Sequence, residues 1–138
     1  NNIDFQADIK NANLIFVEGR DLSTILNNVL DNAVESAKNA EKKYIYLTLK
    51  FANSFEVLTV VNSCLNKPNS HDGTLITTKN DARLHGYGTR SVKRTVAKYN
   101  GEYDWSYDET KKEFHLNIMF NSDKTASKDN ALIDKGGN

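Results

Sequence analysis

The sequence predicts an α+β domain, and two kinds of periodicity predict it. Residues 21–37, and a shorter stretch that ends at Tyr99, carry apolar residues at the three- and four-residue spacing of amphipathic helices. Two pairs of stretches alternate apolar and polar residues as strands do: 43–51 with 55–61, and 102–108 with 114–120. Helix, hairpin, helix and hairpin therefore follow one another along 138 residues, enough for one domain with a substantial core.

Composition narrows the function classes. Lys plus Arg and Asp plus Glu both number 18, so the net charge is zero and nucleic acid is not an expected partner. One cysteine, Cys64, excludes an internal disulfide and a multi-thiolate metal site. No signal peptide and no run of 18 apolar residues is present. Because the chain starts at Asn1 without Met, we expect it to be cut from a longer protein.

Residues 1–20 look extended and half-buried, and they predict a strand or an edge strand. Ile3 and Phe5 lie between polar neighbours, and so do Leu14 and Phe16. The first hairpin turns at Asn53 and Ser54. The second hairpin turns within residues 108–112, and the polar tail 122–138 is expected to be disordered.

The first helix, 21–37, has Asp21 as its predicted N-cap and a polar stripe of unusual composition. At about 100° per residue, Asn28, Asn32 and Glu35 fall within roughly 60° of arc opposite the apolar face, with Asp31 at its edge. Asn is a mediocre helix former, so propensity does not explain this choice. Converging amide and carboxylate oxygens suit Mg²⁺, whereas the alternative is a solvated polar face.

Residues 62–85 show no helical or strand period and contain Pro68 and Gly73. A structureless segment of this length inside a compact domain is usually functional, so it predicts a lid or binding loop; the alternative is a disordered insertion. Gly86, Tyr87 and Gly88 then predict a turn that opens a second helix, which stops at 100–101. Such a turn presents backbone N–H groups to an anion, although glycines also start helices for steric reasons.

Two of these segments resemble a known family. NNVLDNAVESA, residues 27–37, looks like the N-box of the GHKL (Bergerat-fold) ATPases, and HGYGTRSVKRTVAKYNG, residues 85–101, looks like their second glycine box. The resemblance covers about residues 3–120 and is closest to the catalytic ATP-binding domain of sensor histidine kinases of the peptide quorum-sensing receptor type. It implies a two-layer α/β sandwich, a mixed and mostly antiparallel sheet with helices on one face.

The resemblance also implies a binding site for ATP and Mg²⁺. Asn32 matches the asparagine that binds Mg²⁺ in the family, and Asn28 matches a second polar position that is a water-activating Glu in hydrolysing members. An amide cannot act as a general base, which favours phosphoryl transfer over hydrolysis. The phosphates would be held by the glycine segment, with a neighbouring loop cation: Gly86, Tyr87, Gly88, Thr89 and Lys79. Arg83 is an equal candidate, and solvated lid charges are the alternative for both cations.

Both glycine boxes depart from the family pattern. Where an Asp-x-Gly-x-Gly box is expected, residues 62–66 read NSCLN, with Asn62 in the place of the acid that binds the adenine amino group. An amide oxygen still accepts that hydrogen bond. Leu84 stands at the usual first glycine of the second box. A degenerate interaction module without kinase activity is therefore the alternative function.

For the whole protein, the resemblance implies a homodimeric membrane receptor with this domain on the cytoplasmic side. The phosphoacceptor His would lie on separate dimerisation helices upstream, and a response regulator would take the phosphoryl group onward. None of His71, His85 and His115 lies in a helix of the required kind. A GHKL protein that phosphorylates Ser, or hydrolyses ATP, fits Asn28 less well.

Overall fold

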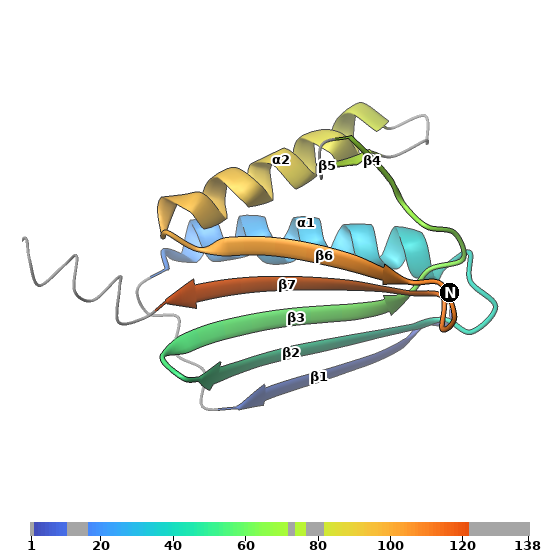
Figure 1. Ribbon diagram of the computed structural model, residues 1–138, viewed down its shortest axis with the longest axis horizontal. Helices are drawn as coiled ribbons and strands as arrows, with labels where there is room; N and C mark the ends of the chain where they lie inside the picture. The colour runs from blue at the N-terminus through green and yellow to red at the C-terminus, as the bar shows by residue number, and fades with distance from the viewer. Residues whose placement is uncertain (1, 11–16, 72–73, 77–81, 122–138) are drawn as a thin grey trace, which may run out of the picture.

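The computed structural model describes residues 2–10, 17–71, 74–76 and 82–121. Within these ranges, two helices cover one face of a five-stranded sheet (Figure 1). The strand order is β1 (Asp4–Lys10), β2 (Tyr44–Ala52), β3 (Phe55–Ser63), β7 (Glu113–Asn121) and β6 (Glu102–Asp108), with β1 parallel to β2 and every other neighbouring pair antiparallel. This two-layer α+β architecture confirms the predicted fold class.

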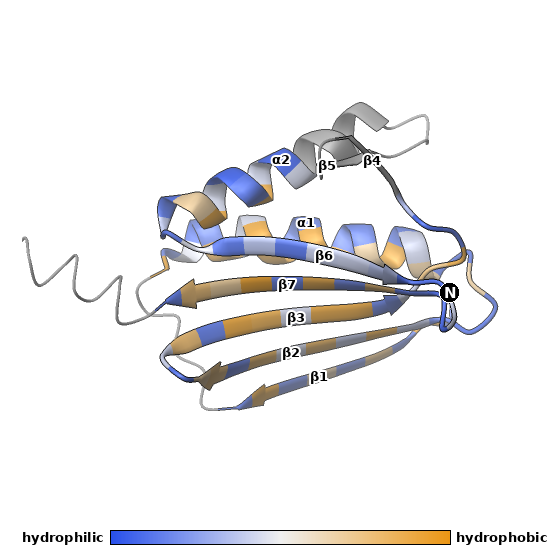
Figure 2. Cartoon of the chain, in the orientation of Figure 1, coloured by the Kyte–Doolittle hydropathy of each residue, from blue (hydrophilic) through white to orange (hydrophobic). Residues whose placement is uncertain are grey.

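Both predicted hairpins are present. β2 (Tyr44–Ala52) pairs with β3 (Phe55–Ser63), and β6 (Glu102–Asp108) pairs with β7 (Glu113–Asn121). Asn53 and Ser54 both have positive φ angles, as a two-residue hairpin turn requires. The orange bands along β2, β3 and β7 in Figure 2 mark the apolar residues of the alternating pattern.

The core lies between the sheet and the helices. Its central side chains come from every second residue of the strands and from one face of each helix. The largest of its fully buried apolar side chains are Ile25, Ile45, Val60, Val92, Val96, Ile118 and Phe120. Burial of these apolar side chains drives the two layers together.

The first strand is more exposed than the sequence predicts. β1 (Asp4–Lys10) lies at the edge of the sheet, and all seven of its residues are exposed. The prediction of a half-buried strand was therefore wrong, because the described helices pack over β2, β3 and β6 and leave β1 uncovered. The predicted alternation at Leu14 and Phe16 lies outside the described residues.

Helix α1 (Gly19–Ala37) begins two residues earlier than predicted. Its N-cap is Glu18, whose side chain makes no capping hydrogen bond, so the prediction that Asp21 caps the helix was wrong. Asp21 is buried inside the first turn, where it binds residues of the second helix. An aspartate can cap a helix or form an ion pair, and the position of its partner in the folded chain decides which of the two it does.

Residues 62–85 contain more regular structure than a lid-like loop would. Asn62 and Ser63 complete β3, a short hairpin joins β4 (Asn69–His71) to β5 (Thr74–Ile76), and α2 (Ala82–Lys98) already begins at Ala82. Within the described residues, the prediction that 62–85 lacks regular structure was therefore wrong at both ends and in the middle. The predicted tail, 122–138, and the domain boundary before it lie outside the described residues.

The end of α2 brings the chain close to the sheet. Asn100 adopts a positive φ, Gly101 N–H donates to Val96 O at 3.0 Å and Asn100 N–H donates to Ala97 O at 3.0 Å. This pair of bonds is the Schellman motif that ends helices. A Cβ on Gly101 would lie 2.9 Å from the carbonyl oxygen of Met119, so only glycine fits as the chain passes from α2 into β6.

Candidate functional site

The predicted metal-binding amides lie on one flank of α1. Asn28 and Asn32 are half-buried, whereas Asn27 and Asp31 are exposed. The prediction that the stripe lies opposite the apolar face was therefore wrong: it borders the core, on a helix that packs against α2 and β3. Asn28 and Asn32 therefore lie where α1 meets neighbouring elements, and other side chains occupy the solvent-exposed face of the helix.

Local contacts orient two members of this flank. Asn28 Nδ2 donates to the Thr24 carbonyl oxygen at 2.8 Å, one turn earlier, which directs its amide oxygen away from that carbonyl. Glu35 forms an ion pair with Lys38 at 3.0 Å. The Glu35 carboxylate is therefore paired with Lys38, which follows the last residue of the same helix.

Asn62, the predicted adenine-binding residue, is the next-to-last residue of β3 and is buried. Its side chain is 1% exposed, lies between Ile45 and Phe114 in the sheet register, and donates from Nδ2 to Ser63 O at 2.9 Å. This bond uses one of the two N–H groups of the amide. The assignment of Asn62 to the adenine amino group stays a prediction from the resemblance.

The segment after Asn62 is held against the sheet. Tyr107 OH donates to Cys64 O at 2.9 Å, and Cys64 Sγ donates to Asn66 O at 3.1 Å. Burial raises the pKa of the Cys64 thiol, so this cysteine stays protonated. Cys64 and Asn66, which stand where the resemblance expects glycines, are thus joined by a hydrogen bond, and Tyr107 ties Cys64 to the sheet.

The glycine segment lies inside α2 and does not form a turn before it. Gly86, Tyr87 and Gly88 are the fifth to seventh residues of the helix, which begins at Ala82. The prediction of a turn at these glycines was therefore wrong. Only the first four N–H groups of a helix lack an intrahelical acceptor, so this conformation does not offer the glycine N–H groups to an anion, and their role in phosphate binding stays a prediction. Thr89 is 4% exposed, and Lys79 lies outside the described residues.

A cluster of side chains that the sequence does not predict joins the start of α1 to the end of α2. Lys98 Nζ lies 2.8 Å from the Asp21 carboxylate, Tyr99 OH donates to the same carboxylate, and Glu18 N–H donates to Tyr99 OH at 3.1 Å. The hydrogen bonds from Lys98 and Tyr99 hold the pKa of Asp21 below its usual value. These contacts join residues 77 and 78 positions apart, a separation that gives no local sequence signal. They fix α1 relative to α2.

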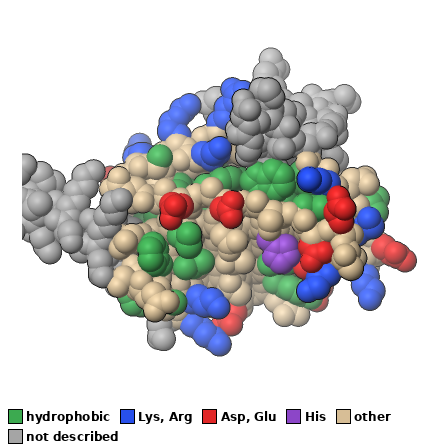
Figure 3. Space-filling model, in the orientation of Figure 1, with side chains coloured by type: hydrophobic (Ala, Val, Ile, Leu, Met, Phe, Trp, Pro, Cys, Tyr) green, Lys and Arg blue, Asp and Glu red, His purple; other side chains and the backbone are tan. Residues whose placement is uncertain are grey.

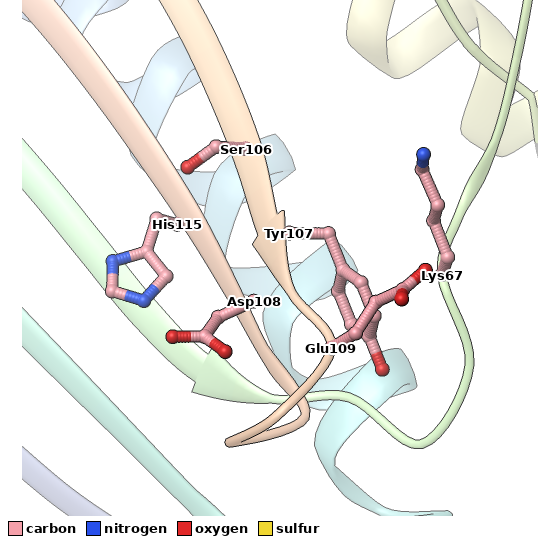
Figure 4. A pocket seen from close by; sticks show the side chains of 6 residues that line it. All are labelled: Lys67, Ser106, Tyr107, Asp108, Glu109 and His115. Atoms are coloured by element: carbon pink, nitrogen blue, oxygen red, sulfur yellow. The ribbon is translucent and has the colours of Figure 1, made fainter.

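An open depression lies beside the turn of the β6–β7 hairpin (Figure 4). It has a volume of about 620 Å³ and mixed charges, and it is lined by Lys67, Ser106, Tyr107, Asp108, Glu109 and His115. None of the predicted site residues lines it. His115 lies in β7 beside Glu113, at 3.1 Å, and Glu113 also accepts a hydrogen bond from Tyr44 at 2.6 Å. Burial and this bond raise the pKa of Tyr44.

The surface charges and the apolar character of the helices identify no further residues of the site. Basic side chains gather over α2 (Figure 3), where Arg90 and Arg94 are exposed, as expected for solvated charges. In the described ranges, His, Cys, Asp and Glu nowhere gather in a group of three that could hold a metal ion. Neither described helix is long and apolar enough to cross a membrane.

The fold and these motifs define a GHKL-type α/β sandwich, and comparison with known proteins identifies the family. The family model for the GHKL domain matches residues 17–121, so the chain belongs to this family. No curated protein sequence matches the chain.

Solved structures show the same fold at low sequence identity. The catalytic domain of histidine kinase ThkA is 17% identical with a TM-score of 0.64, over 88% of this chain and 80% of that one. The histidine kinase domain of the blue-light-activated kinase EL346 from Erythrobacter litoralis is 15% identical with a TM-score of 0.69, over 91% and 54%. The Acinetobacter baumannii histidine kinase AdeS is 14% identical with a TM-score of 0.61, over 87% and 54%. The chain thus spans about half of the last two.

Proposed function

We propose that this chain is the ATP-binding catalytic domain of a sensor histidine kinase. The observation that carries the proposal is the pair Asn28 and Asn32, one helical turn apart on the half-buried flank of α1, in a chain of the GHKL family. The likeness of the fold to histidine kinase catalytic domains supports the same reading.

The amide oxygens of Asn28 and Asn32 are suitable ligands for Mg²⁺. Amide oxygens are hard ligands, and Mg²⁺ in proteins keeps several waters and shares phosphate oxygens, so two protein ligands suffice. Asn28 and Asn32 would hold this ion, which supplies charge neutralisation for the transferred phosphoryl group. Because an amide at position 28 cannot deprotonate water, we propose phosphoryl transfer to a side chain as the reaction.

Asn62 would recognise the nucleobase. One N–H of its amide donates to Ser63 O, and its carbonyl oxygen would accept from the exocyclic amine of adenine. Guanine carries a carbonyl oxygen at that place and would leave two acceptors facing each other. The resemblance alone assigns Gly86, Tyr87, Gly88, Thr89 and Lys79 to the phosphates. In the conformation described, these glycines lie within α2.

For the parent protein we propose a homodimeric receptor of the peptide quorum-sensing type. The resemblance, and no contact in this chain, supports the receptor type, its membrane location with this domain on the cytoplasmic side, and the response regulator that receives the phosphoryl group. The phosphoacceptor would be a His on dimerisation helices of the same protein. His115, a strand residue that contacts Glu113, is not placed for that role.

The test is titration of the 138-residue chain with a fluorescent ATP analogue, with and without Mg²⁺. Asn32→Ala removes the proposed ligand, and Asn27→Ala removes an exposed amide from the same helix as a matched control. We expect Mg²⁺ to strengthen binding, Asn32→Ala to weaken it about tenfold or more, and Asn27→Ala to leave it unchanged. Equal effects of the two variants would contradict the metal assignment.

A degenerate interaction module is the second candidate, and one observation favours it. Tyr107 fastens the segment that replaces the first glycine box, at Cys64 O and Leu65 O. A segment held in place by these hydrogen bonds is less able to change its conformation around a bound nucleotide. Absence of binding at about millimolar nucleotide, near the weakest affinity that a specific site shows, would favour this module over the kinase domain.

A further inference from the structure

The exposed edge of the sheet carries an apolar strip. Among the described strands, β1 has a neighbour on one side only, β2 (Figure 1). Phe5 and Ile9 are 51% and 64% exposed, although they lie opposite Ile45 and Leu49 on the face of the sheet that bears the helices. A long edge strand with exposed apolar residues is a ready template for pairing with another strand.

The direction of the backbone groups can be assigned from one hydrogen bond. Asp4 N–H donates to Lys43 O at 2.9 Å, so residue 4 points its backbone groups at β2. These groups alternate along a strand, and therefore Gln6, Asp8 and Lys10 also point at β2. Phe5, Ala7 and Ile9 point their N–H and C=O groups at the outer edge.

We propose that this edge pairs with β1 of a second copy of the chain, antiparallel and with the two-fold axis at Ala7. Ala7 then faces Ala7 of the second copy, and Phe5 faces Ile9 in both directions. All three outward-pointing residues become hydrogen-bonded pairs, which is the arrangement that antiparallel strands use. The two sheets become one sheet of ten strands.

The side chains are self-complementary in this register. Asp4 lies opposite Lys10 of the second copy, twice in each dimer, and Gln6 lies opposite Asp8. Moving the two-fold axis to Gln6 would place Asp4 opposite Asp8, and moving it to Asp8 would place that carboxylate opposite its own copy. Like charges directly opposite are destabilising, so charge selects the register centred on Ala7.

The arrangement also covers the apolar strip. A two-fold axis perpendicular to the sheet keeps the helices of both copies on the same face. Phe5 and Ile9 of one copy then adjoin Ile9 and Phe5 of the other in the groove between the two α1 helices. An edge pairing of seven residues a side is smaller than a standard interface, so we expect a weak and reversible dimer.

The experiment is sedimentation equilibrium of the 138-residue chain between about 10 μM and 1 mM, the range in which weak dimers dissociate. Lys10→Glu and Asp4→Lys each place like charges opposite one another, and both positions are exposed, so the fold stays intact. We expect each to weaken the dimer about tenfold, and the double variant to return to within about twofold of the parent. Lys111→Glu, in an exposed turn, is the matched control and should have no effect.

Amide hydrogen exchange provides a second readout that does not depend on any variant. The amides of Phe5, Ala7 and Ile9 should gain protection as concentration rises, whereas those of Gln6 and Asp8 bond to β2 and should be protected throughout. A chain that is monomeric at the highest concentration overturns the proposal. So does a dimer that ignores the charge reversals, or one without the alternating protection.

Discussion

Gly101 and Gly19 offer a paired test of how closely the chain packs where α2 meets the sheet. An alanine Cβ at position 101 would lie 2.8 Å from Val96 Cγ1, 2.9 Å from Met119 O and 2.9 Å from Phe120 Cδ1. Val96 and Phe120 are both buried, and the third atom belongs to the backbone, so none of them can move aside without cost. A Cβ at Gly19 would meet nothing within 4 Å.

The same substitution should therefore act in opposite directions at the two sites. We expect Gly101→Ala to lower the free energy of unfolding by about 1–3 kcal/mol, the usual cost of overpacking. We expect Gly19→Ala, at the first residue of α1, to raise it by about 0.5 kcal/mol, because the alanine restricts the unfolded chain and favours helix.

Urea unfolding followed by circular dichroism at 222 nm measures both variants. The slope of free energy against urea must stay constant for the comparison to hold. In thermal unfolding, the loss at Gly101 corresponds to a midpoint lower by roughly 3–12 °C. Equal stability of Gly101→Ala and the parent would refute the close approach of residues 96, 101 and 119 on which the placement of α2 depends.

Two further predictions concern the acceptor in the nucleotide site and the contact between the helices. If Asn62 reads adenine, ATP should displace a bound analogue about tenfold better than GTP, and Asn62→Ala should abolish the preference; a preference that survives would exclude Asn62 from base recognition. Because Lys98 and Tyr99 lower the pKa of Asp21, the stability contributed by this carboxylate is fully present above its unfolded-state pKa of about 3.9 and is lost as pH falls through the lower folded value. Asp21→Asn should therefore be less stable at neutral pH and flatten the acid limb in urea midpoints, and an unchanged acid limb would contradict the assigned cause.

Local periodicity determined the elements that the sequence predicts well. The apolar spacing of 21–37 and the alternation of the two hairpins reflect backbone geometry within a few residues, and the structure confirms both. The same reasoning identified the stop at Asn100 and Gly101, because the residues that end a helix act within one turn. The resemblance of 27–37 and 85–101 to GHKL motifs is likewise a local pattern, and the family model confirms that family.

Other features were decided by contacts between distant parts of the chain. Whether Asp21 caps its helix or binds Lys98 depends on a partner 77 residues away. β1 is exposed because the described helices lie over other strands, which alternation along β1 cannot reveal. The amides of α1 became a protected flank only when the helix packed against α2 and β3. Sequence periods report local backbone geometry, whereas burial and pairing follow from which surfaces meet in the folded domain.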